Sequence, residues 1–163
     1  MKLRNQIEWA IHCMEFLARA PKGVFIPTKI LAKFHGIPKE YLSKALQQLA
    51  SSGLIEGTLG PRGGYQLSKA PSEISLLEIV ESIEGKKRTF NCQEIRFNNP
   101  CLKKKDKDRS VKCAIASAML EADEAWRRVL EDKKLSEIVT DINSQVPAEI
   151  FEKAEEWVNE EMS

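Results

Sequence analysis

The apolar positions at the start of the chain recur at helical spacing and predict three helices in succession. A helix over residues 3–19 gathers on one face the apolar side chains of Leu3, Ile7, Ile11, Met14 and Leu17. A second helix is expected over residues 28–35, with Thr28 as its N-cap and Gly36 closing it. The third helix begins at Pro38 and ends at Gly53.

The next segment, LIEGTLGPRGGYQLS at residues 54–68, predicts a β-hairpin. Leu54 and Ile55 begin one strand, Leu67 ends the other, and a glycine-rich tip lies between them. Short helices joined by a glycine turn and followed by such a hairpin are typical of a winged helix-turn-helix. The predicted fold class is therefore mainly α, with a winged helix-turn-helix and its two-stranded wing over residues 1–85.

Beyond the hairpin, the pattern predicts a helix that Ser75 caps and Gly85 ends, and then a loop over residues 86–112. A long helix and a following short one are expected over residues 111–143, and an acidic amphipathic helix over residues 147–161. The long helix has apolar residues at alternating spacings of four and three, namely Ile115, Met119, Ala122, Trp126 and Val129. Because this heptad spacing is typical of two packed helices, we expect dimerisation into a homodimer through these residues.

The net charge of +1 conceals an uneven distribution of charge along the chain. Residues 1–70 carry ten Lys/Arg and four Asp/Glu, and the remainder carries fifteen and twenty. A basic front half indicates a polyanion-binding surface, although scattered solvated lysines would give the same count. No apolar run is long enough to cross a bilayer, and the N-terminus lacks the apolar core of a signal peptide. We therefore expect a cytoplasmic protein without a membrane partner.

The third helix carries most of the side chains that we expect to contact double-stranded DNA. An α-helix fits the major groove, where lysine suits phosphate or guanine and glutamine suits adenine. The predicted contacts are Lys39, Glu40, Tyr41, Ser43, Lys44 and Gln47 on this helix, Thr28 and Lys29 on the preceding one, and Arg62 and Gly63 at the hairpin tip. Polar helix faces and glycine hairpins also occur without DNA. The order of the elements, with six Lys/Arg against two acids over residues 28–69, favours DNA binding.

Three of the four cysteines follow a C-x8-C-x11-C spacing in or beside the loop, at Cys92, Cys101 and Cys113. The absence of a close CxxC pair disfavours a structural zinc ribbon. An iron–sulfur cluster needs four or more ligands, and side chains other than thiolates complete some clusters. Glu8 and His12 lie four residues apart, on one face of the first helix, and are available for this purpose. An ordinary surface ion pair and unligated thiols are the alternatives, and Cys13 is expected to pack as a small hydrophobe.

Three stretches of the chain resemble the Rrf2 family of winged-helix transcription regulators. IPKEYLSKALQQL at residues 37–49 is similar to the recognition helix of that family, and GPRGGYQLS at residues 60–68 to its wing. ISLLEIVESIEG at residues 74–85 is similar to the helix that follows the wing. The resemblance extends from residue 1 to about residue 143 and implies DNA binding and dimerisation.

The resemblance also bears on a metal cofactor. Family members with a cluster carry three cysteines between the fourth helix and the long helix, in the order and place of Cys92, Cys101 and Cys113. The iron–sulfur assembly regulators add a histidine where this chain has Ala116. The segment EWAIHC is similar to a redox-sensing branch whose cluster uses Glu and His of the first helix and two cysteines of the other subunit. The resemblance thus implies Glu8 and His12 as ligands of an iron–sulfur cluster, [2Fe–2S] rather than [4Fe–4S], and leaves open which cysteines bind.

These features predict a transcription regulator, a repressor whose operator binding is controlled by an iron–sulfur cluster that senses redox state or nitric oxide. A second interpretation keeps DNA binding without a cluster, under the control of a partner protein or of thiol oxidation. A third is a protein-interaction module that docks through the acidic C-terminal helix. An enzyme is not expected, because two histidines without a nucleophile motif or a phosphate loop offer little catalytic chemistry.

Overall fold

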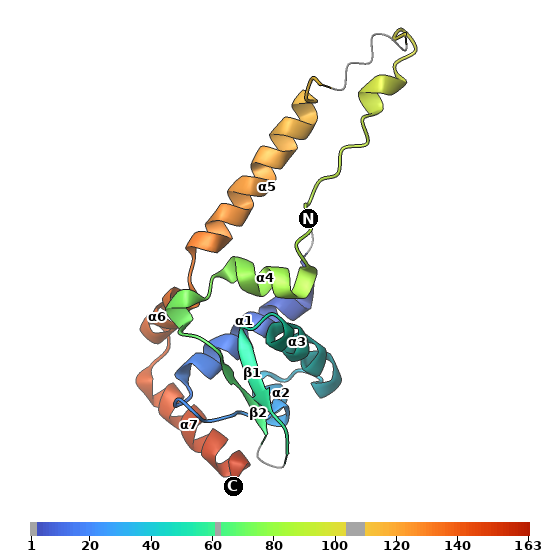
Figure 1. Cartoon of the computed structure of the whole chain (residues 1–163). Coiled ribbons are helices and arrows are strands. Elements are labelled where there is room, and N and C mark those ends of the chain that lie inside the picture. The colour runs from blue at the N-terminus through green and yellow to red at the C-terminus, as the bar shows by residue number, and fades with distance from the viewer. Residues whose placement is uncertain (1–2, 61–62, 104–109) are drawn as a thin grey trace.

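The computed structural model of the chain describes residues 3–60, 63–103 and 110–163 (Figure 1). Its helices are α1 (Asn5–Arg19), α2 (Thr28–His35), α3 (Lys39–Ser51), α4 (Leu76–Glu84), α5 (Ala114–Asp132), α6 (Leu135–Gln145) and α7 (Ala148–Met162). Two strands, β1 (Ile55–Thr58) and β2 (Gly64–Leu67), form one antiparallel sheet. Single 3₁₀ turns lie at Pro71–Glu73 and Ile95–Asn98. The predicted fold class, a mainly α winged helix-turn-helix followed by a long helix, is confirmed.

Helix α1 lies at the centre of the core and packs against α3, α4, α6 and β2. Its predicted apolar face is buried at Ile7, Met14 and Leu17, while Leu3 lies at the edge with 36% of its surface exposed. Cys13 is fully buried in the same face, as expected, and burial raises the pKa of its thiol to about 12. Burying each large apolar side chain stabilises the fold by roughly 1.5–3 kcal/mol, so α1 anchors the winged part of the molecule.

The turn between α2 and α3 follows the predicted pattern, with one correction at each helix start. Thr28 is the first residue of α2, and Pro27 occupies the N-cap position without a side-chain cap, so the prediction of Thr28 as N-cap is wrong. The Pro27 carbonyl instead accepts the backbone N–H groups of Ile30 and Leu31. Pro38 likewise precedes α3 as its N-cap. Between the helices Gly36 has a φ of 63°, a left-handed conformation that glycine adopts without strain.

The wing is a hairpin whose register runs from Ile55 opposite Leu67 to Thr58 opposite Gly64. A third strand-like segment joins it, because Ile26 and Tyr65 exchange two backbone hydrogen bonds of 2.9 Å. A Cβ atom at Gly64 would lie 2.4 Å from the backbone carbonyl carbon of Ile26, so only glycine allows this close approach. The wing is thereby fixed to the segment that leads into α2.

Helix α4 begins and ends as predicted. The Ser75 hydroxyl accepts the N–H of Glu78, whose carboxylate accepts the N–H of Ser75, and Gly85 caps the other end. The same segment is tied to the start of α6, because Leu135 donates its N–H to the Ile74 carbonyl over 2.9 Å. This pairing brings the chain that follows α5 back to the winged part.

Helix α5 extends away from the other helices, and residues 86–103, which follow α4, run out toward the N-terminal end of α5 (Figure 1). The helix begins at Ala114 rather than at residue 111, because Cys113 is extended and occupies the N-cap position. Helix α6 continues to Gln145, two residues beyond its predicted end. Among the described residues, no helix is both long and apolar enough to cross a membrane.

Helix α7 packs against α2 rather than projecting freely from the end of the chain. Trp157 contacts Phe34 with 5.6 Å between ring centroids, and the Glu161 carboxylate pairs with the Lys33 ammonium at 2.5 Å. Val158 is the buried residue of this helix. The acidic helix thus stabilises the outer side of the helix-turn-helix.

Candidate nucleic-acid interface and cysteine site

The outer face of α3 is a polar stripe, and its inner face is core. Leu42, Ala45, Leu46 and Leu49 are fully buried. Glu40, Lys44, Gln47 and Ser51 are exposed at spacings of four, three and four residues, which places them in one row along the helix. Tyr41 stands beside this row with 56% of its surface exposed. The helix therefore presents to solvent the polar side chains that the sequence predicts as DNA contacts.

The remaining predicted contacts lie around this face. Lys39 is exposed at the first turn of α3, and its carbonyl accepts the hydroxyl of Ser43, which is half-buried. Lys29 is exposed and Thr28 half-buried at the start of α2. Gly63 belongs to the tip of the wing, where its N–H donates to the Gly60 carbonyl over 2.9 Å. Arg62, also predicted at this tip, lies outside the residues that the structure describes.

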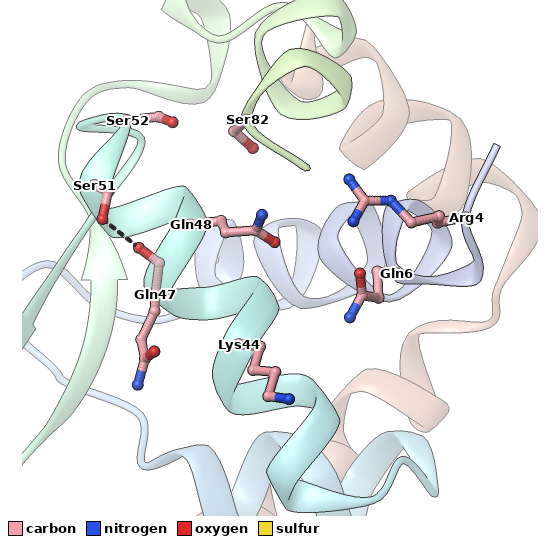
Figure 2. A pocket seen from close by; sticks show the side chains of 8 residues that line it. All are labelled: Arg4, Gln6, Lys44, Gln47, Gln48, Ser51, Ser52 and Ser82. Atoms are coloured by element: carbon pink, nitrogen blue, oxygen red, sulfur yellow. Dashed lines mark hydrogen bonds between the residues drawn. The ribbon is translucent and has the colours of Figure 1, made fainter. Parts of the chain in front are cut away.

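An open hollow of about 550 Å³ adjoins the polar stripe of α3 (Figure 2). Helices α1, α3 and α4 contribute to its lining, which consists of Arg4, Gln6, Lys44, Gln47, Gln48, Ser51, Ser52 and Ser82. Sequence reasoning found Lys44 and Gln47 but missed the other six residues. The polar run of Gln47, Gln48 and Ser51 was a signal on α3, but the residues of α1 and α4 become neighbours only through the fold.

The guanidinium of Arg4 is fixed at the rim of this hollow. Its Nε lies 3.1 Å from the Glu84 carboxylate, and a terminal nitrogen donates to the Ile83 carbonyl. The backbone N–H of Arg4 also donates to Glu84 over 2.9 Å. That backbone hydrogen bond is the main cause that lowers the pKa of the Glu84 carboxyl. Helix α4 therefore orients the start of α1.

Two of the predicted metal ligands, Cys92 and Cys113, lie together at the start of α5. The backbone N–H groups of Ala116 and Ile115, the positive charge of Arg96 and a hydrogen bond with the Cys92 thiol lower the pKa of the Cys113 thiol. A thiolate is the form that binds metal and the form that oxidises, so this pair is suited to either chemistry.

Arg96 closes the segment that carries this thiol pair. Its Nε bonds to the Glu94 carboxylate over 2.8 Å, and a terminal nitrogen donates to the Val111 carbonyl over 2.6 Å. Glu94 has a φ of 53°, and its N–H donates to the Cys92 sulfur over 3.4 Å. The Arg96 side chain therefore bonds both to Glu94, two residues after Cys92, and to Val111, two residues before Cys113. Sequence reasoning missed this arginine.

One chain does not bring the five predicted ligands together. Cys101 is exposed, and its N–H donates to the Asn99 side chain over 2.9 Å. Glu8 and His12 are exposed on α1, beside a second hollow of about 440 Å³. Within residues 3–60, 63–103 and 110–163, no three His, Cys, Asp or Glu side chains are grouped closely enough to hold a metal ion. The Cys92–Cys113 pair and the Glu8–His12 pair thus lie at two separate places in the chain.

The predicted dimerisation stripe lies on the exposed side of α5. Ile115 is 71% exposed, Met119 43% and Val129 68%. Ala122 is also exposed, and Trp126 is half-buried against the core. A contiguous apolar face of this kind is typical of a helix that packs against a partner.

Helices α2 and α3 and the glycine-tipped β1–β2 wing form a winged helix-turn-helix in which α3 presents an exposed polar face. This arrangement defines the chain as a winged-helix DNA-binding protein. The chain belongs to the Rrf2 family, described as iron-dependent transcriptional regulators, whose model matches residues 3–141. Rrf2 proteins are transcription regulators that bind DNA, not enzymes, and this chain is a transcription regulator of that family.

Individual relatives agree with this assignment. The HTH-type transcriptional regulator NsrR of Halalkalibacterium halodurans is 29% identical over 140 residues, which cover 86% of this chain and 91% of the relative. CymR (YrzC), the global cysteine regulator of B. subtilis, has a similar structure, with a TM-score of 0.67 and 19% identity over 86% of this chain and 97% of that chain. T. potens IscR gives a TM-score of 0.67 and 20% identity over 91% and 93%. The two structures show the shared fold.

Proposed function

We propose that this chain is a homodimeric repressor whose operator binding is controlled by a [2Fe–2S] cluster at each subunit junction. The observation that carries the proposal is the division of the ligands into two half-sites. The Cys92–Cys113 pair lies at the start of α5, and the Glu8–His12 pair is exposed on α1. The apolar stripe of α5 begins beside the thiol pair, at Ile115. A second copy packed along α5 would supply the half-site that one chain lacks.

The side chains present fit such a cluster. Two thiolates, one carboxylate and one imidazole make four ligands, the number that a [2Fe–2S] cluster needs. The lowered pKa of Cys113 favours the thiolate that binds iron. Cys101 is exposed on the same loop as a third thiol. When bound, the cluster would supply a change of charge with oxidation state, or a reaction with nitric oxide.

Helix α1 connects the proposed ligands to the DNA-binding face. It carries Glu8 and His12 on its exposed side and packs against α3 and α4 with the other. A helix in a tightly packed core moves as a unit, so a displacement of α1 would shift α3 and the spacing between the two recognition helices of a dimer. The relatives named NsrR, IscR and CymR support regulation of transcription as the output.

Anaerobic purification tests the cluster directly. We expect a coloured protein with about two iron and two sulfide ions per chain, the content of one [2Fe–2S] cluster. The visible spectrum should change in the variants Glu8→Gln and Cys92→Ser. Glu152→Gln, on the exposed side of α7, is the matched control and should leave the spectrum unchanged. A protein that stays colourless after reconstitution with iron and sulfide would refute the cluster. Comparing Cys101→Ser with Cys92→Ser identifies the ligating thiols.

Selection from a random DNA library tests operator binding. We expect one enriched DNA sequence that consists of two similar halves, one for each α3 helix of the dimer. Gln47→Ala should reduce the discrimination between bases at one position of the operator. Arg62→Ala should weaken binding to all DNA sequences alike and reduce the slope of log K against log salt by about one. A library that yields no enriched sequence would exclude specific DNA binding by this chain.

A second candidate function is favoured by the closeness of Cys92 and Cys113. In a regulator without a cluster, a hydroperoxide would oxidise these two thiols to one disulfide and be reduced to an alcohol and water. Operator affinity would then follow the oxidation of the thiols and not the iron content. Measuring affinity after treatment with peroxide, in protein freed of iron, separates the two candidates.

A further inference from the structure

The hollow beside α3 is lined by eight polar side chains, none of them a carboxylate. In Figure 2 the side chains of Arg4 and Gln6, from the start of α1, extend toward Gln48 of α3, and Ser82 of α4 lies above them. The start of one helix, the middle of another and the end of a third thus converge on one open volume. Such a lining suits an anion better than a cation or an apolar ligand.

Not every polar group of this lining is available to a ligand. The Ser51 and Ser82 hydroxyls donate to the carbonyls of Gln47 and Ile79 in their own helices. Within the described part of the chain, by contrast, no hydrogen bond or ion pair engages the side chains of Gln6, Lys44 and Gln48. Two amides and one ammonium group are therefore free to donate.

The place of the hollow indicates which anion it binds. Lys44 and Gln47 belong both to the exposed row of α3 and to the lining. A helix that lies in the major groove has a sugar–phosphate strand along each side, because the two strands form the walls of the groove. The hollow opens beside the helix, where such a strand would run if α3 lay in the major groove. Phosphate contacts of this kind fix the register of a protein on DNA.

We propose that this hollow binds one phosphodiester group of the DNA strand that borders α3. Lys44 supplies the charge, the amides of Gln6 and Gln48 donate to the phosphate oxygens, and Arg4 shapes the rim. The proposal rests on the proposed function of DNA binding and extends the interface from α3 and the wing to α1. It also gives α1 a second role, because Gln6 lies two residues before the proposed ligand Glu8.

The local charges set the size of the expected effect. The charge of Arg4 is balanced by Glu84, with 3.1 Å between Nε and the carboxylate. Glu40 lies one turn before Lys44 in the exposed row and reduces the local positive potential. The hollow therefore offers at most one unbalanced positive charge, that of Lys44. One phosphate contact corresponds to a change of about 0.9 in the slope of log K against log salt.

Replacing amides by carboxylates of the same shape tests this proposal. Gln6→Glu and Gln48→Glu place a negative charge where the phosphate would lie, and each should weaken operator binding about tenfold at low salt. The selected base preference should stay the same, because a phosphate contact weakens all sequences alike. Gln145→Glu makes the same chemical change at the exposed end of α6 and serves as the control. Thermal unfolding of all three variants checks that the fold is intact.

A DNA-side experiment locates the phosphate. A series of operators is prepared in which one neutral methylphosphonate linkage replaces a different phosphate in each. At one position the replacement should weaken binding of the unmodified protein but barely affect binding of Gln48→Glu. The proposal is overturned if both variants bind like Gln145→Glu, if they alter the base preference, or if no linkage shows this coupling. A chain that selects no DNA sequence at all contradicts the proposed function instead, so the two failures are distinct.

Discussion

The winged part of the molecule and helix α5 differ sharply in what they bury. Helix α1 has 15 residues and buries six of them, five of which are apolar or sulfur-containing. Helix α5 has 19 residues and buries only Asp123. Both helices have apolar residues at regular helical spacing, so the difference lies in the partner and not in the pattern. The apolar face of α1 meets α3 and α4, whereas the α5 stripe is exposed to solvent except at the half-buried Trp126.

This contrast shows that one chain buries the apolar face of its DNA-binding part but leaves the apolar stripe of α5 exposed. The winged part has a buried apolar core, and the polar face of α3 is exposed to solvent. Among the residues that the structure describes, neither the thiol pair nor the Glu8–His12 pair is part of a group of three possible metal ligands, and the stripe of α5 is largely exposed. We therefore expect substitutions in the buried core of the winged part to act on folding, and substitutions along the exposed stripe of α5 to act on association.

The largest effect on folding is expected in the core between α1 and α3. Leu46 is fully buried, and Leu46→Ala should lower the free energy of unfolding by about 2–5 kcal/mol, because the lost methyl groups leave a cavity. Val129→Ala removes a similar apolar side chain from α5, where Val129 is 68% exposed, and should cost no more than about 0.5 kcal/mol in the single chain. Urea unfolding of dilute protein measures both. Equal losses at the two positions would contradict the contrast between the two helices.

The next largest effect is expected where α5 joins the winged part. The Asp123 carboxylate accepts the Thr89 hydroxyl over 2.6 Å, and its other oxygen lies 3.1 Å from Arg127 Nε. Asp123→Asn keeps the shape but turns an amide toward Arg127, and should cost about 2 kcal/mol, the range for hydrogen bonds to charged groups. Glu121→Asn, on the exposed side of the same helix, is the control.

The pH dependence of stability provides a second readout at Asp123. The Thr89 hydroxyl and, after it, Arg127 lower the pKa of this carboxyl below its usual value of 3.8. Because a lowered pKa stabilises the folded state above the usual value, this contribution is present at neutral pH and is lost as the pH falls below about 4. The difference between the wild-type chain and Asp123→Asn should therefore shrink in acid. A constant difference down to pH 2 would show that the carboxylate is not the stabilising group.

Much of the winged part could be predicted from sequence because its signals are local. The Ser75–Glu78 capping box, the Gly36 turn and the apolar spacing of α1 depend on residues a few positions apart. The wrong N-cap at Thr28 reflects a local competition, since Pro27 holds the extended conformation that precedes the helix. Family resemblance and local pattern together were sufficient for this part.

The features that the sequence did not predict depend on contacts between residues far apart in the chain. The Trp157–Phe34 contact of α7, the tie of Arg96 to Val111 and the lining of the hollow by Arg4 follow from tertiary packing. No spacing rule in the sequence identifies such pairs. The heptad pattern of α5 predicted an apolar face, but its exposure in the single chain is a finding of the structure.

A smaller loss is expected at the cap of α4. Ser75 is 3% exposed, and Ser75→Ala removes the acceptor for the N–H of Glu78, at a cost of about 1 kcal/mol. Ser72→Ala changes an exposed serine three residues earlier and should have no measurable effect on thermal unfolding. Similar melting temperatures for the two variants would show that the cap contributes nothing to stability.

The smallest effect on the single chain, and the sharpest test of the contrast, is expected at Ile115. This residue is 71% exposed at the start of α5, so Ile115→Asp should change the unfolding of dilute protein by less than about 0.5 kcal/mol. Burying a carboxylate in an apolar seam is costly, however, so the same substitution should convert a dimer into monomers in analytical ultracentrifugation. Ile150→Asp, at a half-exposed position on α7, should leave the dimer intact. If both variants sediment as the unmodified chain does, α5 is not the dimer interface, and the two half-sites of the proposed cluster must be joined by another surface.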